Sequence, residues 1–188
     1  TGSMWVSNSP IAALSWYRAF YGKFDPAKPV LSFNNPAGSQ SFTFLKQLVS
    51  EDGSWVGQQE VPYAYFATRL ALAYEGTLDD VIIQEGYQQR AESVDQWLSL
   101  PYPTPDGTGS LSMETVSIGI AKGTPAEQLG SWLFARWLLT EEAQERLVHI
   151  HGYWPVTDDP QDVAADYAEV HPAWASALLD GVKLTLAP

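Results

Sequence analysis

A small polar residue followed directly by proline recurs along this sequence, and each such pair predicts the first turn of a helix. Proline is tolerated there because that N–H has no intrahelical partner, and the polar side chain accepts a neighbouring free N–H. The pairs are Ser9-Pro10, Asn35-Pro36, Thr124-Pro125 and Asp159-Pro160, with His171-Pro172 as a looser example. Thr124 and Glu127 also have capping-box spacing, which makes this the best-defined helix start in the chain.

Short apolar segments lie between the predicted helices and are typical of buried strands. The predicted strands are Val30–Phe33, Leu70–Tyr74, Val94–Leu100 and Thr115–Ala121. The predicted helices are Pro10–Tyr21, Pro36–Val49, about Gln58–Thr68, Leu78–Arg90, Pro160–Val170 and Pro172–Leu179, with two more beginning after Thr124 and Thr140. Helices that separate short buried strands indicate an α/β fold, with a mixed, mainly parallel sheet and helices on both faces.

The helix after Thr124 carries apolar residues at three- and four-residue spacing. Leu129, Trp132, Leu133 and Trp137 recur at this interval, which predicts one buried stripe on the helix. Phe42 and Phe44 lie on a similar stripe of an earlier helix, and we expect both groups in the core.

Length and composition limit the possible classes of protein. A chain of 188 residues is long enough to bury a sizeable core as one domain, and 45% hydrophobic residues with 17% charged residues argue against disorder. Its apolar runs are too short to span a bilayer. The formal net charge is −12, from 22 acidic residues against 10 Lys and Arg, so cations that could neutralise nucleic acid or an anionic membrane are scarce.

Catalytic and metal-binding patterns have little support. The chain has no cysteine, which excludes disulfides and thiolate metal sites. His149 and His151 are two residues apart and so point to different sides of a helix. The acidic pairs Asp79-Asp80 and Asp158-Asp159 are explained by helix starts. No nucleophile-elbow, phosphate-loop or dinucleotide motif occurs, so we expect no enzyme activity, no metal and no cofactor.

The stretch from Asp95 to Val156 resembles the second lobe of extracellular solute-binding proteins, the sugar-type receptors of ATP-binding-cassette importers. The motifs that carry this resemblance are Pro101-Tyr102-Pro103 with Gly107, Gly119-Ile120-Ala121-Lys122, the helix pair from Trp132 through Phe134, Trp137, Leu138 and Glu142 to Gln144, and Gly152-Tyr153-Trp154-Pro155-Val156. Phe42–Gly53 and Thr68–Gly76 are similar to earlier segments of the same lobe. Leu72 and Leu78 depart from the family pattern, which often has Met and a ligand-stacking Trp at these places.

The resemblance implies one lobe of a type II periplasmic-binding-protein fold. Residues 1–4 are then interpreted as a tag remnant plus Met4, and residues 5–188 as a single lobe whose partner lobe is absent. The implied function is non-catalytic binding of a neutral solute, above all a sugar or oligosaccharide. The implied partners are a membrane permease and the first lobe. The implied location is extracellular or periplasmic, and this location allows a lipid anchor on the full-length protein. The alternative is a sensor or scaffold module of a larger receptor.

Ligand contacts are expected in loops at the ends of strands, where open α/β sheets bind ligands. These are Glu75, Gly76 and Thr77 after one strand, Glu114 and Thr115 before the next, and the aromatic turn residues Tyr153 and Trp154. With 8 Trp, 9 Tyr and 7 Phe, the chain has aromatic faces on which the C–H face of a sugar ring could pack. We expect Glu75, Thr77, Glu114 and Trp154 to line one rim around a shallow concavity.

A lobe without its partner supplies only half of the cleft walls. Pockets bury about 70–90% of a small ligand, so we expect the isolated lobe to bind sugars weakly or undetectably. The surface that faces the other lobe should be unusually apolar and should favour self-association.

Overall fold

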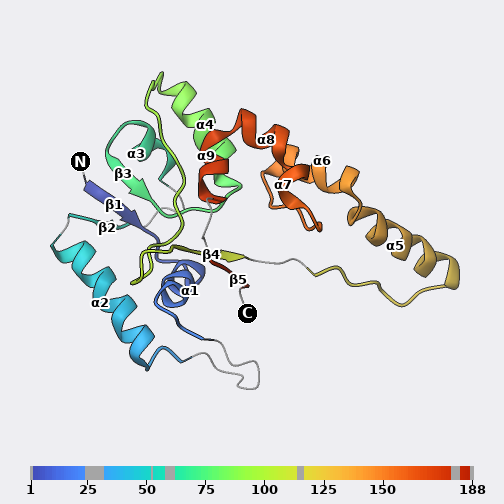
Figure 1. Ribbon diagram of the computed structural model, residues 1–188, viewed down its shortest axis with the longest axis horizontal. Coiled ribbons are helices and arrows are strands. Elements are labelled where there is room, and N and C mark those ends of the chain that lie inside the picture. The colour runs from blue at the N-terminus through green and yellow to red at the C-terminus, as the bar shows by residue number, and fades with distance from the viewer. Residues whose placement is uncertain are drawn as a thin grey trace.

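The computed structural model describes residues 2–23, 32–51, 53–57, 62–113, 117–178 and 183–186. Strands and helices alternate through the first two thirds of the chain, and helices dominate the last third (Figure 1). The strands are β1 (Gly2–Val6), β2 (Trp55–Val56), β3 (Ala71–Tyr74), β4 (Ser110–Met113) and β5 (Lys183–Leu186). The helices are α1 (Pro10–Ala19), α2 (Pro36–Ser50), α3 (Tyr63–Ala67), α4 (Asp80–Arg90), α5 (Pro125–Leu138), α6 (Glu141–His151), α7 (Pro160–Val163), α8 (Ala165–Val170) and α9 (Pro172–Ala175), followed by a 3₁₀ turn at Ser176–Leu178.

Two parallel sheets organise the described residues. The first has three strands in the order β2-β1-β3, and both of its pairings are parallel, with Met4 beside Ala73 and Trp5 beside Trp55. Its strands lie between α3 and α4 on one side and α1 and α2 on the other (Figure 1). The second sheet is the parallel pair β4-β5. The predicted α/β class, with parallel strands and helices, is therefore confirmed.

The predicted helix caps form as expected. The side chains of Ser9, Asn35, Thr140 and Asp159 each accept a backbone N–H three residues onward, and Thr124 makes the complete capping box with Glu127. These are local contacts, so the helix starts follow directly from neighbouring residues.

The main core joins helices from distant parts of the chain. It is built from Val81 on α4, Val148 on α6, Ala164, Tyr167 on α8, Ala173 and Trp174, and Leu78, Trp97 and Trp154 pack against its edge. Trp5 on β1 and Trp16 on α1 are also buried.

The sequence did not predict the strand β1, and it did not predict β2, β4 or β5.

The prediction of a strand at Val94–Leu100 is wrong. This segment is irregular and exposes Val94, Leu98 and Leu100, and its Ser99 backbone is bonded to α9 and the 3₁₀ turn that follows it instead of to a strand. The Ser99 N–H approaches both the carbonyl of Ala173 and the hydroxyl of Ser176, at 3.3 and 2.9 Å.

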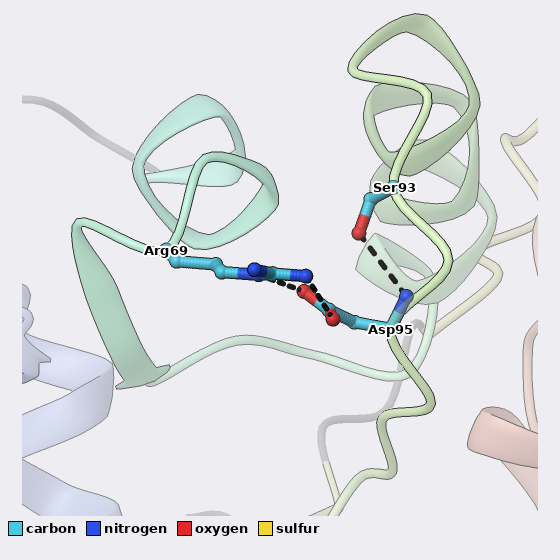
Figure 2. Close-up of polar contacts among 3 residues, drawn as sticks. All are labelled: Arg69, Ser93 and Asp95. Carbon is cyan, nitrogen blue, oxygen red and sulfur yellow. Dashed lines mark hydrogen bonds and ion pairs between the residues drawn. The ribbon is translucent and has the colours of Figure 1, made fainter.

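The start of this irregular segment is held by an exposed ion pair (Figure 2). Arg69, in the turn before β3, donates from Nε and from a terminal guanidinium nitrogen to the two oxygens of Asp95, at 2.7 and 2.6 Å. The Asp95 N–H donates to the Ser93 hydroxyl at 3.3 Å. The pair ties the loop after α4 to the entrance of β3.

The predicted strand at Thr115–Ala121 is also not observed in its described part. Residues 117–121 are exposed and belong to no strand, and residues 114–116 lie outside the described residues. At the predicted strand Val30–Phe33, Ser32 and Phe33 are irregular, and residues 30 and 31 are not described.

Several helices are shorter than predicted. The helix expected at Gln58–Thr68 is observed only as α3, with residues 58–61 outside the description, and α4 begins at Asp80 instead of Leu78. The tail helix divides at Ala164 into α7 and α8, and the last helix passes into the 3₁₀ turn.

The apolar stripe of α5 is exposed, so its predicted place in the core is wrong. Leu129, Trp132, Leu133 and Trp137 are all exposed, and no residue of α5 is buried. The residue spacing does form a stripe on α5, but α6 is the one described element that packs substantially on this helix. Phe42 is likewise exposed, whereas Phe44 contacts the rings of Trp16 and Phe20. Among the described residues, no helix is long and apolar enough to cross a membrane.

Candidate functional site

Glu75 follows β3 directly and is buried in the body of the domain. Its carboxylate accepts the indole N–H of Trp16 from α1 and the backbone N–H of Ser7 from the loop after β1. The ring of Tyr102 meets Trp16 edge to face, with centroids 4.9 Å apart. Glu75 therefore joins the carboxyl ends of β1 and β3 to α1.

The electrostatics of this cluster follow from its burial. Burial raises the pKa of the Glu75 carboxyl, while the N–H donors of Ser7 and Trp16 oppose the change. Burial also raises the pKa of the Tyr102 phenol, and the neighbouring charge of Glu75 adds to that effect. Because Glu75 is only 8% exposed, it braces the site and does not present a free carboxylate to solvent.

Gly76 and Thr77 lead from β3 into α4 and are organised by Asp80. One Asp80 oxygen accepts both the N–H and the hydroxyl of Thr77, at 2.7 and 2.9 Å, and the other accepts the Tyr63 hydroxyl. A Cβ on Gly76 would lie 2.8 Å from the first of these oxygens, which explains a glycine in this turn. Burial and the hydrogen bond to Asp80 raise the pKa of Tyr63.

The aromatic turn after α6 lies against the same loop. Gly152 ends α6 in the left-handed conformation, with φ of 68°, and its carbonyl accepts the indole N–H of Trp174 at 2.7 Å. A Cβ on Gly152 would be 2.9 Å from the Tyr167 hydroxyl and 3.4 Å from the Leu78 carbonyl. The loop after β3 and the turn after α6 are therefore neighbours at Leu78 and Gly152.

Tyr153 and Trp154 have different environments. Trp154 is half-buried and stacks on Trp174, with ring centroids 5.7 Å apart, so packing accounts for much of its surface. Tyr153 is 49% exposed and stacks on His151 at 5.0 Å. Of these two aromatics, Tyr153 has the ring that a ligand could reach.

Glu114 and Thr115 lie outside the described residues, so their place relative to Glu75 remains a prediction. Ser112 and Met113, just before them, belong to β4, which packs on α1. Sequence reasoning did not identify Ser7, Trp16 and Tyr102 as neighbours of Glu75. No local pattern indicates this contact, because the partners come from three separate segments.

The described residues contain no group of three or more His, Asp and Glu side chains that could hold a metal ion. The polar groups present offer hydrogen bonds and an aromatic face. This arrangement suits recognition of a small polar molecule.

Comparison with known proteins places these features in a family context. A family model described as "Bacterial extracellular solute-binding protein" matches residues 2–175. No curated protein sequence matches the chain. Among solved structures, the crystal structure of UgpB from Mycobacterium tuberculosis in complex with glycerophosphocholine is similar, with a TM-score of 0.68 and 15% sequence identity. The match covers 98% of this chain and 47% of the UgpB chain, so this chain spans about half the length of that structure.

Proposed function

Because the chain belongs to the family of bacterial extracellular solute-binding proteins, we propose that it forms one wall of a solute-binding cleft. The observation that carries this proposal is the meeting of the loop after β3 with the turn after α6. The loop after β3 lies at the carboxyl end of a strand, where open α/β sheets bind ligands, and the turn after α6 lies beside it. Gly76, Thr77 and Tyr153 would contact the solute, and Glu75 would hold the loops in position.

A sugar or oligosaccharide is the solute class that we propose. The exposed ring of Tyr153 offers a face for the C–H groups of a pyranose, and Thr77 offers a hydroxyl for its polar edge. The net charge of −12 disfavours an anionic solute through long-range repulsion. We also include Glu114, Thr115 and Trp154 in the proposed rim of the cleft, because the sequence predicts them in the loops and the turn that border it.

We further propose that a second lobe supplies the opposite wall and that the two close over the solute by a hinge motion. Support comes from the coverage of only 47% of the UgpB chain. The closed form would deliver its solute to the permease of an ATP-binding-cassette importer outside the cytoplasm, and no catalytic step is involved. A lipid anchor would hold such a receptor at the membrane.

Calorimetry on a two-lobed protein that contains this chain tests the proposal. Titration with a panel of mono- and oligosaccharides should give saturable binding, and Tyr153→Ala should weaken it at least several-fold. Tyr21→Ala removes another exposed aromatic ring, at the end of α1, and should leave affinity unchanged. Glycerophosphocholine, named in the UgpB structure, is the comparison ligand.

Binding of glycerophosphocholine without any sugar would contradict the sugar assignment while keeping the receptor function. Absence of binding to the whole panel, in a folded two-lobed protein, would favour the alternative of a sensor or scaffold module. Unchanged sugar affinity in Tyr153→Ala would remove this residue from the site.

A further inference from the structure

The histidine that ends α6 lies against the exposed aromatic ring of the proposed site. The rings of His151 and Tyr153 are stacked, with centroids 5.0 Å apart and an angle of 23° between their planes. Both side chains are exposed, so packing in the core does not force the two rings together. The stack therefore belongs to the surface of the domain, where a ligand can reach it.

The backbone between the two rings is fixed by hydrogen bonds. Gly152 separates His151 from Tyr153 and is left-handed, with φ of 68° and ψ of 20°. Its N–H donates to the Val148 carbonyl and its own carbonyl accepts the indole N–H of Trp174, both at 2.7 Å. Residues two apart in a helix do not face each other, but the helix ends at Gly152 and the two rings meet there. The stack is therefore built on a backbone that is held at both of its polar groups.

The other histidine of α6 has a different neighbour. The ring of His149 meets the ring of Tyr167 on α8 edge to face, with centroids 5.7 Å apart and planes at 84°. His149 is exposed like His151, but Tyr167 is a core residue and is only 1% exposed. Of the two histidines, His151 is thus the one that contacts the ring presented by the proposed site.

We propose that His151 is a positioning residue of the solute site, whose imidazole covers one face of the Tyr153 ring and holds the opposite face towards the solute. This inference rests on the proposed function, in which a sugar packs on Tyr153. The side chain of Tyr153 is 49% exposed, and no other ring among the described residues contacts it. The solute therefore packs on a platform of two stacked rings and approaches it from one side.

The stack favours binding because it orders the Tyr153 side chain before the solute arrives. Offset-stacked aromatic pairs prefer centroid separations of about 4.5–7 Å, and the observed 5.0 Å lies within this range. A side chain that is still mobile loses rotamer freedom when a ligand immobilises it, and this loss weakens binding. The cost for one side chain corresponds to an increase of about two- to tenfold in the Kd.

The position of His151 in the last turn of α6 offers an alternative role. A histidine at this place can bind the last carbonyls of the helix or interact favourably with its dipole. That role requires a ring nitrogen or a positive charge, whereas the positioning role requires only a flat ring. Phenylalanine keeps the flat ring and has neither nitrogen nor charge, so His151→Phe separates the two roles.

The stack is tested first without a solute, by NMR on the 188-residue chain. The chain has three histidines, so single substitutions can assign their imidazole C–H signals. Tyr153→Leu removes the ring current over His151 and should move the His151 signals downfield, while the His149 signals stay in place. Unmoved His151 signals would overturn the proposal, because the two rings would then not be stacked in solution.

The effect on binding is measured by calorimetry on a two-lobed protein that contains this chain, with the sugar that binds it. His151→Ala should raise the Kd about two- to tenfold, and His151→Phe should return it close to the value of the unsubstituted protein. His149→Ala is the matched control and should leave the Kd unchanged. In a Tyr153→Ala background, His151→Ala should have no further effect, because His151 acts through Tyr153.

The outcomes separate this inference from the proposed function. If Tyr153→Ala weakens binding and His151→Ala does not, the positioning role is overturned and the proposed function stands. Equal losses in His151→Ala and His151→Phe would overturn the positioning role in favour of the ring nitrogen or its charge. A further loss from His151→Ala in the Tyr153→Ala background would also overturn it. Unchanged affinity in Tyr153→Ala would overturn the proposed contact with Tyr153, and the positioning role with it.

Discussion

The indole N–H of Trp16 donates to the buried carboxylate of Glu75, 59 residues further along the chain. This contact joins α1 to the end of β3, and the Ser7 N–H adds the end of β1 to the same carboxylate. The loop that begins the proposed cleft is therefore held in place by hydrogen bonds to the buried carboxylate of Glu75.

Glu75→Gln should change how stability depends on pH. Burial raises the folded-state pKa of Glu75, so its protonation stabilises the fold fully below the unfolded-state pKa, and this contribution is lost as pH rises through the folded-state pKa. The free energy of unfolding of the unsubstituted protein should therefore rise relative to Glu75→Gln as pH is lowered from about 7 towards the ordinary carboxyl range near 4.3.

Urea unfolding of both proteins at a series of pH values measures this difference. Glu145→Gln, on an exposed part of α6, is the matched control. The opposite trend would mean that the N–H groups of Ser7 and Trp16 outweigh the burial of Glu75.

Gly152→Ala should destabilise the domain. Its φ of 68° is unfavourable for a residue with a side chain, and the new Cβ would lie 2.9 Å from the Tyr167 hydroxyl. Strain of this kind costs about 1–3 kcal/mol, which thermal unfolding can detect. Gly107→Ala has a similar positive φ, of 77°, but has open space around its Cβ, so it should cost less. Equal losses in the two variants would show that the contact with Tyr167 contributes nothing.

Trp174→Phe should weaken the attachment of the aromatic turn. The substitution keeps an aromatic ring in the core but removes the donor that bonds the Gly152 carbonyl at 2.7 Å. Loss of this buried hydrogen bond, together with some ring volume, should lower the free energy of unfolding by about 1–3 kcal/mol. In the variant, hydrogen exchange of residues 152–156 should become faster than in the unsubstituted protein, whereas exchange of β3 should change less. Unaltered protection of that turn would contradict the role assigned to the indole N–H.

Asp95→Asn should have a small effect that disappears in high salt. Arg69 lowers the pKa of Asp95 through hydrogen bonds, so the pair stabilises the fold above the unfolded-state pKa and is lost as pH falls through the folded-state pKa. Both groups are exposed, so added salt should screen the pair. Unfolding of both proteins at low and high salt measures the difference, and a difference that persists at high salt would contradict this account.

The isolated lobe should bind sugars weakly or undetectably, because half of the proposed cleft is supplied from elsewhere. Calorimetry on the 188-residue chain alone measures this. Tight one-to-one binding would show that the contacts on this chain suffice and that the split cleft is mistaken.

Much of the local structure could be predicted from the sequence. The starts of α1, α2, α5 and α6 follow from capping contacts within three residues, and β3 follows from its short apolar run before a glycine turn. The motifs from Pro101 to Val156 indicated the family that the match over residues 2–175 then showed. All of these signals are carried by residues close together in the chain.

Burial and pairing were decided by contacts between distant residues, and there the sequence was insufficient. The apolar spacing of α5 predicts an amphipathic helix, yet only the fold shows that no described element covers its stripe. The segment Val94–Leu100 has the composition of a strand, but its Ser99 backbone bonds to Ala173 of α9 and Ser176 of the following 3₁₀ turn. Glu75 faces inward because Trp16 and Ser7 reach it from separate elements. Helix caps depend on neighbouring residues, whereas pairing and burial depend on which distant surfaces meet, and local sequence carries little information about those surfaces.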